Sequence, residues 1–257
     1  MSTILVTGGT GTLGSLVTAR LRARGHEVRV LSRRSPEYPV DLTTGEGLDA
    51  ALAGADAVVH CASDARGAGR GDEAAARNLV AAARRSGLRH LLYISIVGVD
   101  AVPFPYYRRK LAVERILAES GLGVTVLRAT QFHDLLGMAA EALGKLPVVP
   151  VPKGVPVQPV ATDDVAARLA ELAEGEPAGR VPDLGGPETR TLDAWLRTYY
   201  AGRGRRRAVL PVPLFGRSYA AFRRGGITAP GHADGTGTFA AYVAGLRPDG
   251  GKAQNRP

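Results

Sequence analysis

The stretch Ile4-Leu5-Val6-Thr7-Gly8-Gly9-Thr10-Gly11-Thr12-Leu13-Gly14 decides the fold of this chain of 257 residues. A short apolar run leads into a glycine-rich turn, and a pattern typical of a helix follows at 12–24. Glycines here let the chain turn tightly and let a pyrophosphate approach the backbone, while the start of the helix supplies N–H donors. The spacing fits GxGxxG and GxxGxxG in the required strand-turn-helix context. We therefore predict that a dinucleotide binds to Thr7, Gly8, Gly9, Thr10, Gly11, Thr12, Leu13 and Gly14.

Short apolar runs alternate with amphipathic stretches through the first 130 residues, which is typical of a parallel sheet wrapped by helices. Glycines suited to a left-handed helix end follow three of the helical patterns, at Gly25, Gly87 and Gly121. We therefore expect an α/β fold with a doubly wound parallel sheet, the Rossmann architecture. The predicted strands are 3–7, 27–31, 57–61, 91–96 and 124–128, with a weaker one at 39–42, and the predicted helices are 12–24, 47–52, 73–86 and 107–120.

The character of the sequence changes after about residue 145. The proline-rich pieces at 147–152 and 211–214 cannot be central strands, because proline donates no hydrogen bond to a sheet. Further helices are predicted at 163–174 and 192–200, each after a threonine that can cap it. We expect an NAD(P)-binding core over 1–145, a smaller substrate-binding lobe packed on it over 146–245, and a disordered tail over 246–257.

Composition narrows the class of protein. Apolar residues make up 45% and charged residues 22% of the chain, as in globular domains. The single cysteine, Cys61, excludes an intramolecular disulfide and a cysteine-rich zinc site, and the histidines show no metal-ligand spacing, so we expect no metal. No leader segment and no membrane helix is recognisable, so we expect a cytoplasmic protein.

The net charge of +9 and the pI of about 10.1 raise the question of a polyanionic partner. The densest basic cluster is Gly202 to Arg207, which can be a solvated loop, a site for an acidic ligand or cofactor phosphate, or a nucleic-acid contact. We favour the solvated loop. We expect a small-molecule substrate, no nucleic acid, no membrane partner, and a monomer or a homodimer.

The end of the second predicted strand bears on the choice of dinucleotide. An acidic residue there would bind the ribose hydroxyls of NAD, but the chain reads Leu31-Ser32-Arg33-Arg34-Ser35. Two guanidiniums at this place suit a 2′-phosphate. We therefore predict NADP(H) in preference to NAD(H), bound by Ser32, Arg33 and Arg34; the alternative is that the arginines point into water.

Together with the glycine loop, several short signatures resemble an atypical short-chain dehydrogenase/reductase of the NAD(P)H-binding, NmrA-like type. They are Asp41-Leu42, Ala62, Asn78, Tyr106-xxx-Lys110, Arg128-Ala129-Thr130-Gln131-Phe132, Asp163-Asp164-Val165-Ala166 and Leu184-Gly185-Gly186-Pro187-Glu188. The resemblance covers roughly residues 3–190. It implies that Asp41 and Leu42 bracket the adenine, that Cys61, Ala62 and Ser63 line the cofactor, and that Ala129 and Thr130 approach the nicotinamide.

Tyr106 and Lys110 are the candidate catalytic pair. Residues at i and i+4 share one helix face, so the ammonium can lower the pKa of the phenol and hold the cofactor ribose. Tyrosine then donates a proton to a carbonyl that receives hydride. Tyr107 is an alternative to Tyr106 as the exposed ring.

Ser95 and His133 are two further candidates for the catalytic site. The family's catalytic serine falls on Val97, which leaves Ser95 as either a cofactor contact or a structural residue at the sheet edge. His133 follows the substrate turn and is either a proton donor or substrate contact, or a structural histidine paired with Asp134 or with backbone. Cys61 is expected to be buried and inert rather than a reactive thiol.

Taken together, these features predict an NADPH-dependent reductase of an apolar carbonyl, enone or quinone. The alternatives are an NADP(H)-sensing protein without turnover and a redox-neutral epimerase or isomerase.

Overall fold

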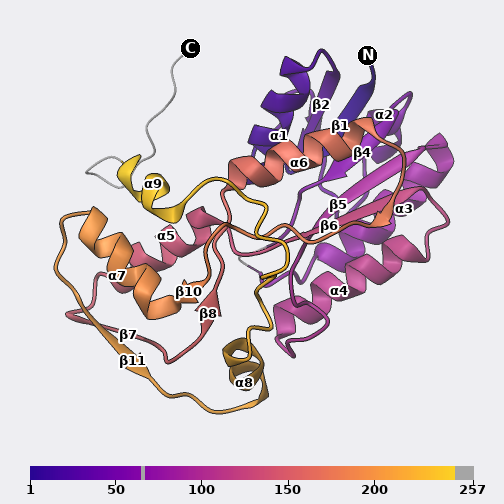
Figure 1. Cartoon of the computed structure of the whole chain (residues 1–257). Coiled ribbons are helices and arrows are strands. Elements are labelled where there is room, and N and C mark those ends of the chain that lie inside the picture. Colours follow the sequence, from indigo (N-terminus) through magenta and orange to yellow (C-terminus); the bar gives the residue numbers. More distant parts are fainter. Residues whose placement is uncertain (65–66, 247–257) are drawn as a thin grey trace. The chain divides into compact units, whose positions relative to one another are not determined.

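The computed structural model describes residues 1–64 and 67–246 and contains a seven-stranded sheet (Figure 1). The strand order is β3-β2-β1-β4-β5-β6-β9, and the pairs β1·β2, β1·β4, β2·β3, β4·β5 and β6·β9 are parallel. This order is that of a doubly wound sheet, in which the chain reverses its direction of growth between β1 and β4. The prediction of a Rossmann architecture is confirmed.

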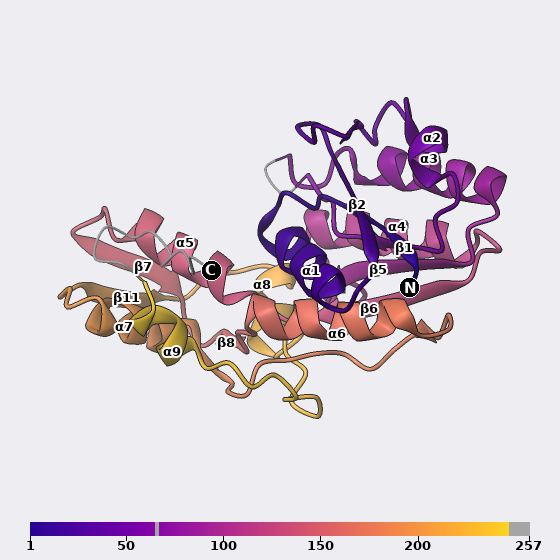
Figure 2. The same ribbon diagram turned by 90° about the horizontal axis from the view of Figure 1, so that it is seen from above.

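Helices cover both faces of this sheet. Figures 1 and 2 show α2, α3 and α4 on one face and α1 and α6 on the other. Both faces of β1 and β4 are therefore buried, which explains why these strands read as apolar runs rather than alternating patterns. The elements are β1 (Thr3–Thr7), α1 (Thr12–Ala23), β2 (Glu27–Ser32), β3 (Tyr38–Pro39), α2 (Leu48–Leu52), β4 (Ala57–His60), α3 (Asp72–Ser86), β5 (His90–Ile96), α4 (Pro105–Ala118), β6 (Val124–Ala129), α6 (Thr162–Glu174) and β9 (Gly179–Arg180).

The remaining elements build two small sheets and the helices around them. β7 (Val148–Pro152) pairs in parallel with β11 (Ala208–Val212), and β8 (Pro156–Val157) pairs antiparallel with β10 (Arg190–Thr191). Both strands of a two-stranded sheet are edge strands, which is where proline is tolerated. The helices are α5 (His133–Leu143), α7 (Leu192–Gly202), α8 (Arg217–Arg223) and α9 (Phe239–Ala244).

The chain divides into two compact units. The first holds residues 1–128 and 165–182, and the second holds 129–164 and the residues from 183 onward. The change in sequence character predicts a single division at residue 145, whereas α6 and β9 belong to the first unit, where they complete its helical layer and its sheet edge. The expected tail over 246–257 lies outside the described residues apart from Leu246. Within 1–64 and 67–246, no helix is long and apolar enough to cross a membrane.

Candidate functional site

The glycine loop lies where the strand order reverses, the usual ligand-binding place of an open α/β sheet. Gly8 has a left-handed backbone with φ of 65°, and its N–H donates to Leu31 O at 2.9 Å. A Cβ at Gly8 would lie 2.8 Å from Ala62 Cα, and a Cβ at Gly14 would collide with Gly8 O. Only glycine fits these two places, and a Cβ at Gly9 would also lie 2.8 Å from Val30 Cγ1, so the turn needs glycine at three places.

The start of α1 is built to receive an anion. Gly11 is its N-cap residue and has no side chain to cap the helix, and the first turn carries no acidic residue. The first N–H groups of a helix, here those of Thr12, Leu13 and Gly14, have no intrahelical acceptor and carry the positive end of the helix dipole. These residues therefore fit a dinucleotide pyrophosphate.

Ser32, Arg33 and Arg34 follow at the end of β2, as predicted. Both arginines are exposed, and neither guanidinium forms a hydrogen bond or ion pair with any residue that the structure describes. Asp41, in the loop after β3, accepts the N–H and the hydroxyl of Thr43 at its Oδ1, at 2.9 and 2.7 Å, and also feels the charge of Arg33. The side-chain hydrogen bond from Thr43 is the main reason why the pKa of Asp41 is lowered.

Asn78 on α3 holds the Asp41–Leu42 turn. Its Nδ2 donates to the carbonyl oxygens of Leu42 and Thr43, each at 2.9 Å. Asn78, one of the residues that carry the family resemblance, therefore positions the loop that we expect to bracket the adenine.

The residues after β4 lie directly beside the glycine loop. Ala62 N–H donates to Thr7 Oγ1 at 3.2 Å, and Thr7 Oγ1 lies 2.7 Å from His60 Nδ1. Cys61 is only partly buried, not buried as predicted, but desolvation raises the pKa of its thiol to about 12, so the thiol stays protonated and fits the inert alternative. Thr7, Cys61 and Ala62 are thus brought together with Gly8.

Tyr106, rather than Tyr107, presents the accessible phenol. α4 begins at Pro105, so Tyr106 lies in its first turn, half-buried, while Tyr107 is buried with its ring edge-on to Phe104 at 5.8 Å. The Tyr106 hydroxyl oxygen lies 3.1 Å from Ser63 Oγ. The candidate phenol and the stretch after β4 therefore belong to one site.

The expected effect of Lys110 on Tyr106 is not found. Lys110 is buried, and its Nζ donates to Ile94 O at 3.3 Å and lies 4.5 Å from the centre of the Tyr93 ring. The pKa of Tyr106 is raised, mainly by desolvation and with Asp72 contributing, whereas desolvation lowers the pKa of Lys110 to about 8. The prediction that the ammonium lowers the phenol pKa is wrong, because the lysine side chain turns towards β5.

Sequence reasoning missed Asp72, the first residue of α3. Its side chain is buried; Oδ2 accepts the Ser63 hydroxyl at 2.6 Å and Oδ1 accepts the Asp64 N–H at 2.8 Å. The signal available was an acidic residue at the start of a helix, which the N-terminal dipole favours. The predicted helix began one residue later and left it out.

Ser95 ends up buried near the carboxyl end of β5. Its hydroxyl has no hydrogen-bond partner within 1–64 and 67–246. Val97, at the place of the family's catalytic serine, is buried and apolar. An unpartnered buried hydroxyl suits a bound group, so Ser95 remains a candidate for a cofactor or substrate contact.

Three predicted residues belong to the second unit. Ala129 ends β6 in a bridge to Leu184, and Thr130 is buried with a hydroxyl that has no partner in the described part of the chain. His133 is buried, with Nε2 3.2 Å from Pro159 O and the rings of Phe239 and Tyr242 each 5.5 Å away. Its surroundings fit the structural alternative, pairing with backbone.

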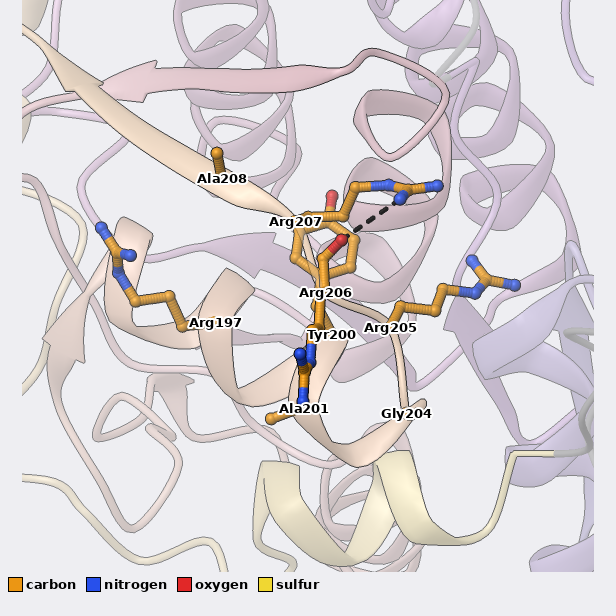
Figure 3. Close-up of a pocket in the computed structure, with 8 residues that line it drawn as sticks. All are labelled: Arg197, Tyr200, Ala201, Gly204, Arg205, Arg206, Arg207 and Ala208. Carbon is orange, nitrogen blue, oxygen red and sulfur yellow. Dashed lines mark hydrogen bonds between the residues drawn. The ribbon is translucent and has the colours of Figure 1, made fainter.

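The basic cluster lines a hollow of about 600 Å³ in the second unit (Figure 3). Figure 3 shows the guanidiniums of Arg197 and Arg205 pointing in different directions. Arg205 pairs with Glu141 at 2.8 Å, and Arg207 donates to the carbonyl oxygen of Arg206 at 3.2 Å. Because the guanidiniums do not converge, the geometry fits a solvated loop better than an anion site.

The fold and these residues define a dinucleotide-binding protein of the atypical short-chain dehydrogenase/reductase class. The chain belongs to the NAD(P)H-binding family, whose model matches residues 8–176. Among curated proteins it is 28% identical over 221 residues to the chloroplastic divinyl chlorophyllide a 8-vinyl-reductase of Zea mays, covering 72% of this chain and 55% of that protein. It is 28% identical over 195 residues to the photosystem II assembly factor Ycf39 of Synechocystis, covering 69% of this chain and 60% of that one. The chain thus spans little more than half the length of these relatives.

Solved structures share the fold. The NADPH-dependent quinone oxidoreductase QOR2 of Escherichia coli, complexed with NADPH, matches with a TM-score of 0.78 and 21% identity over 94% of this chain and 98% of that chain. The UDP-glucose 4-epimerase of Thermus thermophilus, complexed with NAD, matches with a TM-score of 0.68 and 23% identity over 82% and 86%. The likeness concerns the architecture, which reductases and epimerases share.

Proposed function

We propose that the protein is an NADPH-dependent reductase that acts on an apolar carbonyl, enone or quinone. The observation that carries this proposal is the hydrogen bond between Tyr106 and Ser63, which joins a candidate proton donor to the stretch beside the glycine loop. Two similar proteins, a quinone oxidoreductase and a vinyl reductase, support the class of substrate.

NADPH, when bound, supplies the hydride. The N–H groups at the start of α1 bind its pyrophosphate, and Arg33 and Arg34 pair with its 2′-phosphate. One N–H of Lys110 donates to Ile94 O, and the other two are the donors that we assign to the ribose. Tyr106 gives its phenolic proton to the substrate oxygen, and the hydroxyl of Ser95 hydrogen-bonds to the cofactor.

Phe104 supports an apolar substrate. It precedes α4, two residues before Tyr106, and is 41% exposed although its ring packs edge-on against Tyr107. An exposed aromatic ring close in sequence to the proposed proton donor offers an apolar surface to a flat, apolar partner. Neither a nucleic-acid partner nor a membrane partner is part of the proposal, and we place the reaction in the cytoplasm.

The test begins with titration of the purified protein with NADPH and NADH. We expect the wild-type protein to bind NADPH more tightly than NADH. The double variant Arg33→Ala, Arg34→Ala should weaken NADPH binding about 10- to 100-fold, because charge-assisted hydrogen bonds contribute roughly 1.5–3 kcal/mol. It should leave NADH binding unchanged. The control Arg223→Ala, Arg224→Ala removes an arginine pair from the second unit. An unchanged cofactor preference in the first variant would refute the assignment of the two arginines.

Turnover is then followed through loss of nicotinamide absorbance with quinones, enones and ketones. We expect consumption with at least one class, and a fall in kcat of about 10²- to 10⁴-fold in Tyr106→Phe. Tight binding without consumption by the wild-type protein would instead favour the NADP(H)-sensing alternative, which the buried Val97 at the place of the catalytic serine allows.

A further inference from the structure

Asp72, Ser63 and Tyr106 form one chain of hydrogen bonds within the first unit. Asp72 is 5% exposed, and both its carboxylate oxygens are occupied, one by Ser63 and the other by the Asp64 N–H. Ser63 in turn lies within hydrogen-bond distance of Tyr106. The chain begins at a buried charge and ends at the proposed proton donor.

The chemistry of the three groups sets the direction of this chain. A carboxylate only accepts hydrogen bonds, so Ser63 donates its single proton to Asp72. Ser63 Oγ can then only accept from Tyr106, and the phenolic proton of Tyr106 points at Ser63. The distance of 2.6 Å between Ser63 Oγ and Asp72 Oδ2 is that of a charge-assisted hydrogen bond, the stronger of the two.

We propose that Asp72 is a positioning residue that acts through Ser63 to set the orientation of the Tyr106 hydroxyl. The proposal rests on the proposed function for the role of Tyr106 in catalysis, but the orientation itself does not depend on turnover. None of the short motifs identified in the sequence contains Asp72, so none of them predicts this role.

The same series of hydrogen bonds determines how Tyr106 regains its proton after each turnover. When Tyr106 gives its proton to the substrate oxygen, the phenolic O–H bond breaks and an O–H bond forms on the product. The Ser63 hydroxyl then turns from Asp72 to the phenolate and donates to it. A proton from bulk solvent, the one that the reduction consumes, afterwards returns to Tyr106, and Ser63 turns back to the carboxylate. Asp72 thus competes with the phenolate for one proton.

The variant Asp72→Asn reverses the direction of the chain while keeping its shape. The fixed N–H of Asp64 requires an acceptor, so the amide of the variant turns its oxygen to Asp64 and its NH₂ to Ser63. Ser63 then accepts from that NH₂ group and donates to Tyr106. Glu73→Gln is the matched control, because it removes the same charge one residue along the helix and Glu73 makes no contact with Ser63.

The readout is the ionisation of Tyr106, followed by NMR of protein labelled with ¹³C at the tyrosine ζ carbon, with Tyr106→Phe identifying the signal. The ionisable groups that act on Tyr106 are Asp64 after β4 and Asp72 on α3, and Tyr93 on β5 interacts with it. We expect the pKa of Tyr106 to fall in Asp72→Asn, because a negative charge is lost and a donor is gained, and to stay unchanged in Glu73→Gln.

Ser63→Ala is the second variant and keeps the Asp72 charge. It removes the donor to the phenolate, so we expect the pKa of Tyr106 to rise, opposite to the effect of Asp72→Asn. An unchanged pKa in both variants, or an equal fall in Glu73→Gln, overturns the proposal. If the wild-type protein consumes no NADPH, the proposed function fails, whereas these titrations still decide the role of Asp72.

With an active enzyme, the same variants separate positioning from support of the fold. We expect Asp72→Asn to raise kcat with little change in KM, because Ser63 then donates to Tyr106 and leaves the phenolic proton free for the substrate. We also expect the alkaline limb of the pH profile of kcat to shift to lower pH. Equal losses in kcat and in NADPH affinity, with an unshifted profile, would contradict the proposal.

Discussion

Gly8 and Gly25 share a left-handed backbone and differ in their surroundings. Gly8 has φ of 65° and packs against Ala62, while Gly25 has φ of 84° and nothing within 4 Å of an added Cβ. Gly25→Ala should therefore cost only the backbone strain, about 1–2 kcal/mol, whereas Gly8→Ala adds a backbone collision and should cost more. Urea unfolding of both variants measures the difference.

NADPH titration adds a second readout for the same pair. Gly8→Ala should abolish NADPH binding and Gly25→Ala should preserve it, since only Gly8 belongs to the phosphate loop. Equal stability and equal binding in the two variants would contradict the close approach of Gly8 to the stretch after β4.

His60 makes the stability of the first unit sensitive to acid. Desolvation, followed by the charge of Lys110, lowers its pKa to about 4, against about 6.5 in the unfolded chain. The unfolded state therefore binds an extra proton between these values, so this contribution to stability is complete above pH 6.5 and lost as the pH falls towards 4. The loss amounts to roughly 3 kcal/mol.

Urea unfolding at pH 7 and pH 5 tests this, with His60→Asn as the comparison. The variant should show a smaller loss of stability between the two pH values than the wild-type protein, because its side chain does not titrate. A loss of the same size in both proteins would show that other groups are responsible.

At the residue scale, the sequence predicted which residues lie near the candidate site but not which hydrogen-bond partners their side chains have. The glycine loop, Ser32 to Arg34 and the stretch after β4 could be placed because strand ends and turn chemistry locate them. The 3.6-residue period placed Lys110 on the face of Tyr106, but the carbonyl of Ile94 and the ring of Tyr93 decide where its ammonium lies. Such contacts between distant segments leave no local signal.

At the scale of elements, α4 is joined to the sheet through a buried ion pair. Arg128 near the end of β6 is 4% exposed and pairs with Glu114 on α4, itself 11% exposed, and with Asp100, which is 49% exposed. Glu114→Ala leaves a buried guanidinium with one partner fewer and should destabilise the protein by about 3 kcal/mol or more. Asp100→Ala removes a mainly exposed partner and should cost at most about 1 kcal/mol.

Thermal or urea unfolding of these two variants checks the ranking. Since Glu114 lies on α4, hydrogen exchange in the helix should also rise in Glu114→Ala and not in Asp100→Ala. A larger effect from Asp100→Ala would mean that burial does not control the strength of this cluster.

The long elements of the first unit were predicted within a few residues, because their hydrophobic periods and terminal glycines are strong local signals. β3 was the exception: only Tyr38 and Pro39 pair with β2, where 39–42 was expected, because Asp41 and Leu42 are drawn into the turn that Asn78 holds. The pairing of β7 with β11, whose partner residues lie 60 positions apart, could not be predicted from local patterns.

At the scale of the whole molecule, the first unit is discontinuous in sequence. A fragment of residues 1–145, which the sequence suggested as a core, lacks α6, whose buried Val165, Ala166, Leu169 and Ala170 help to cover one face of the sheet. We expect this fragment to bind the dye ANS and to lose cooperative unfolding, whereas the full chain unfolds cooperatively. A fragment that unfolds as cooperatively as the full chain would show that α6 is dispensable.

The return of the chain to its first unit also matters while the protein is being made. Ribosomes add about 5–20 residues per second, so roughly 3 to 10 seconds separate the synthesis of Arg128 from that of Pro182. During this interval the nascent sheet has its glycine loop and most of its strands but not the helix that completes one of its layers. The nascent polypeptide therefore exposes the apolar sheet face that α6 later covers until residues 165–182 have been synthesised. We expect a chaperone to bind at that exposed face.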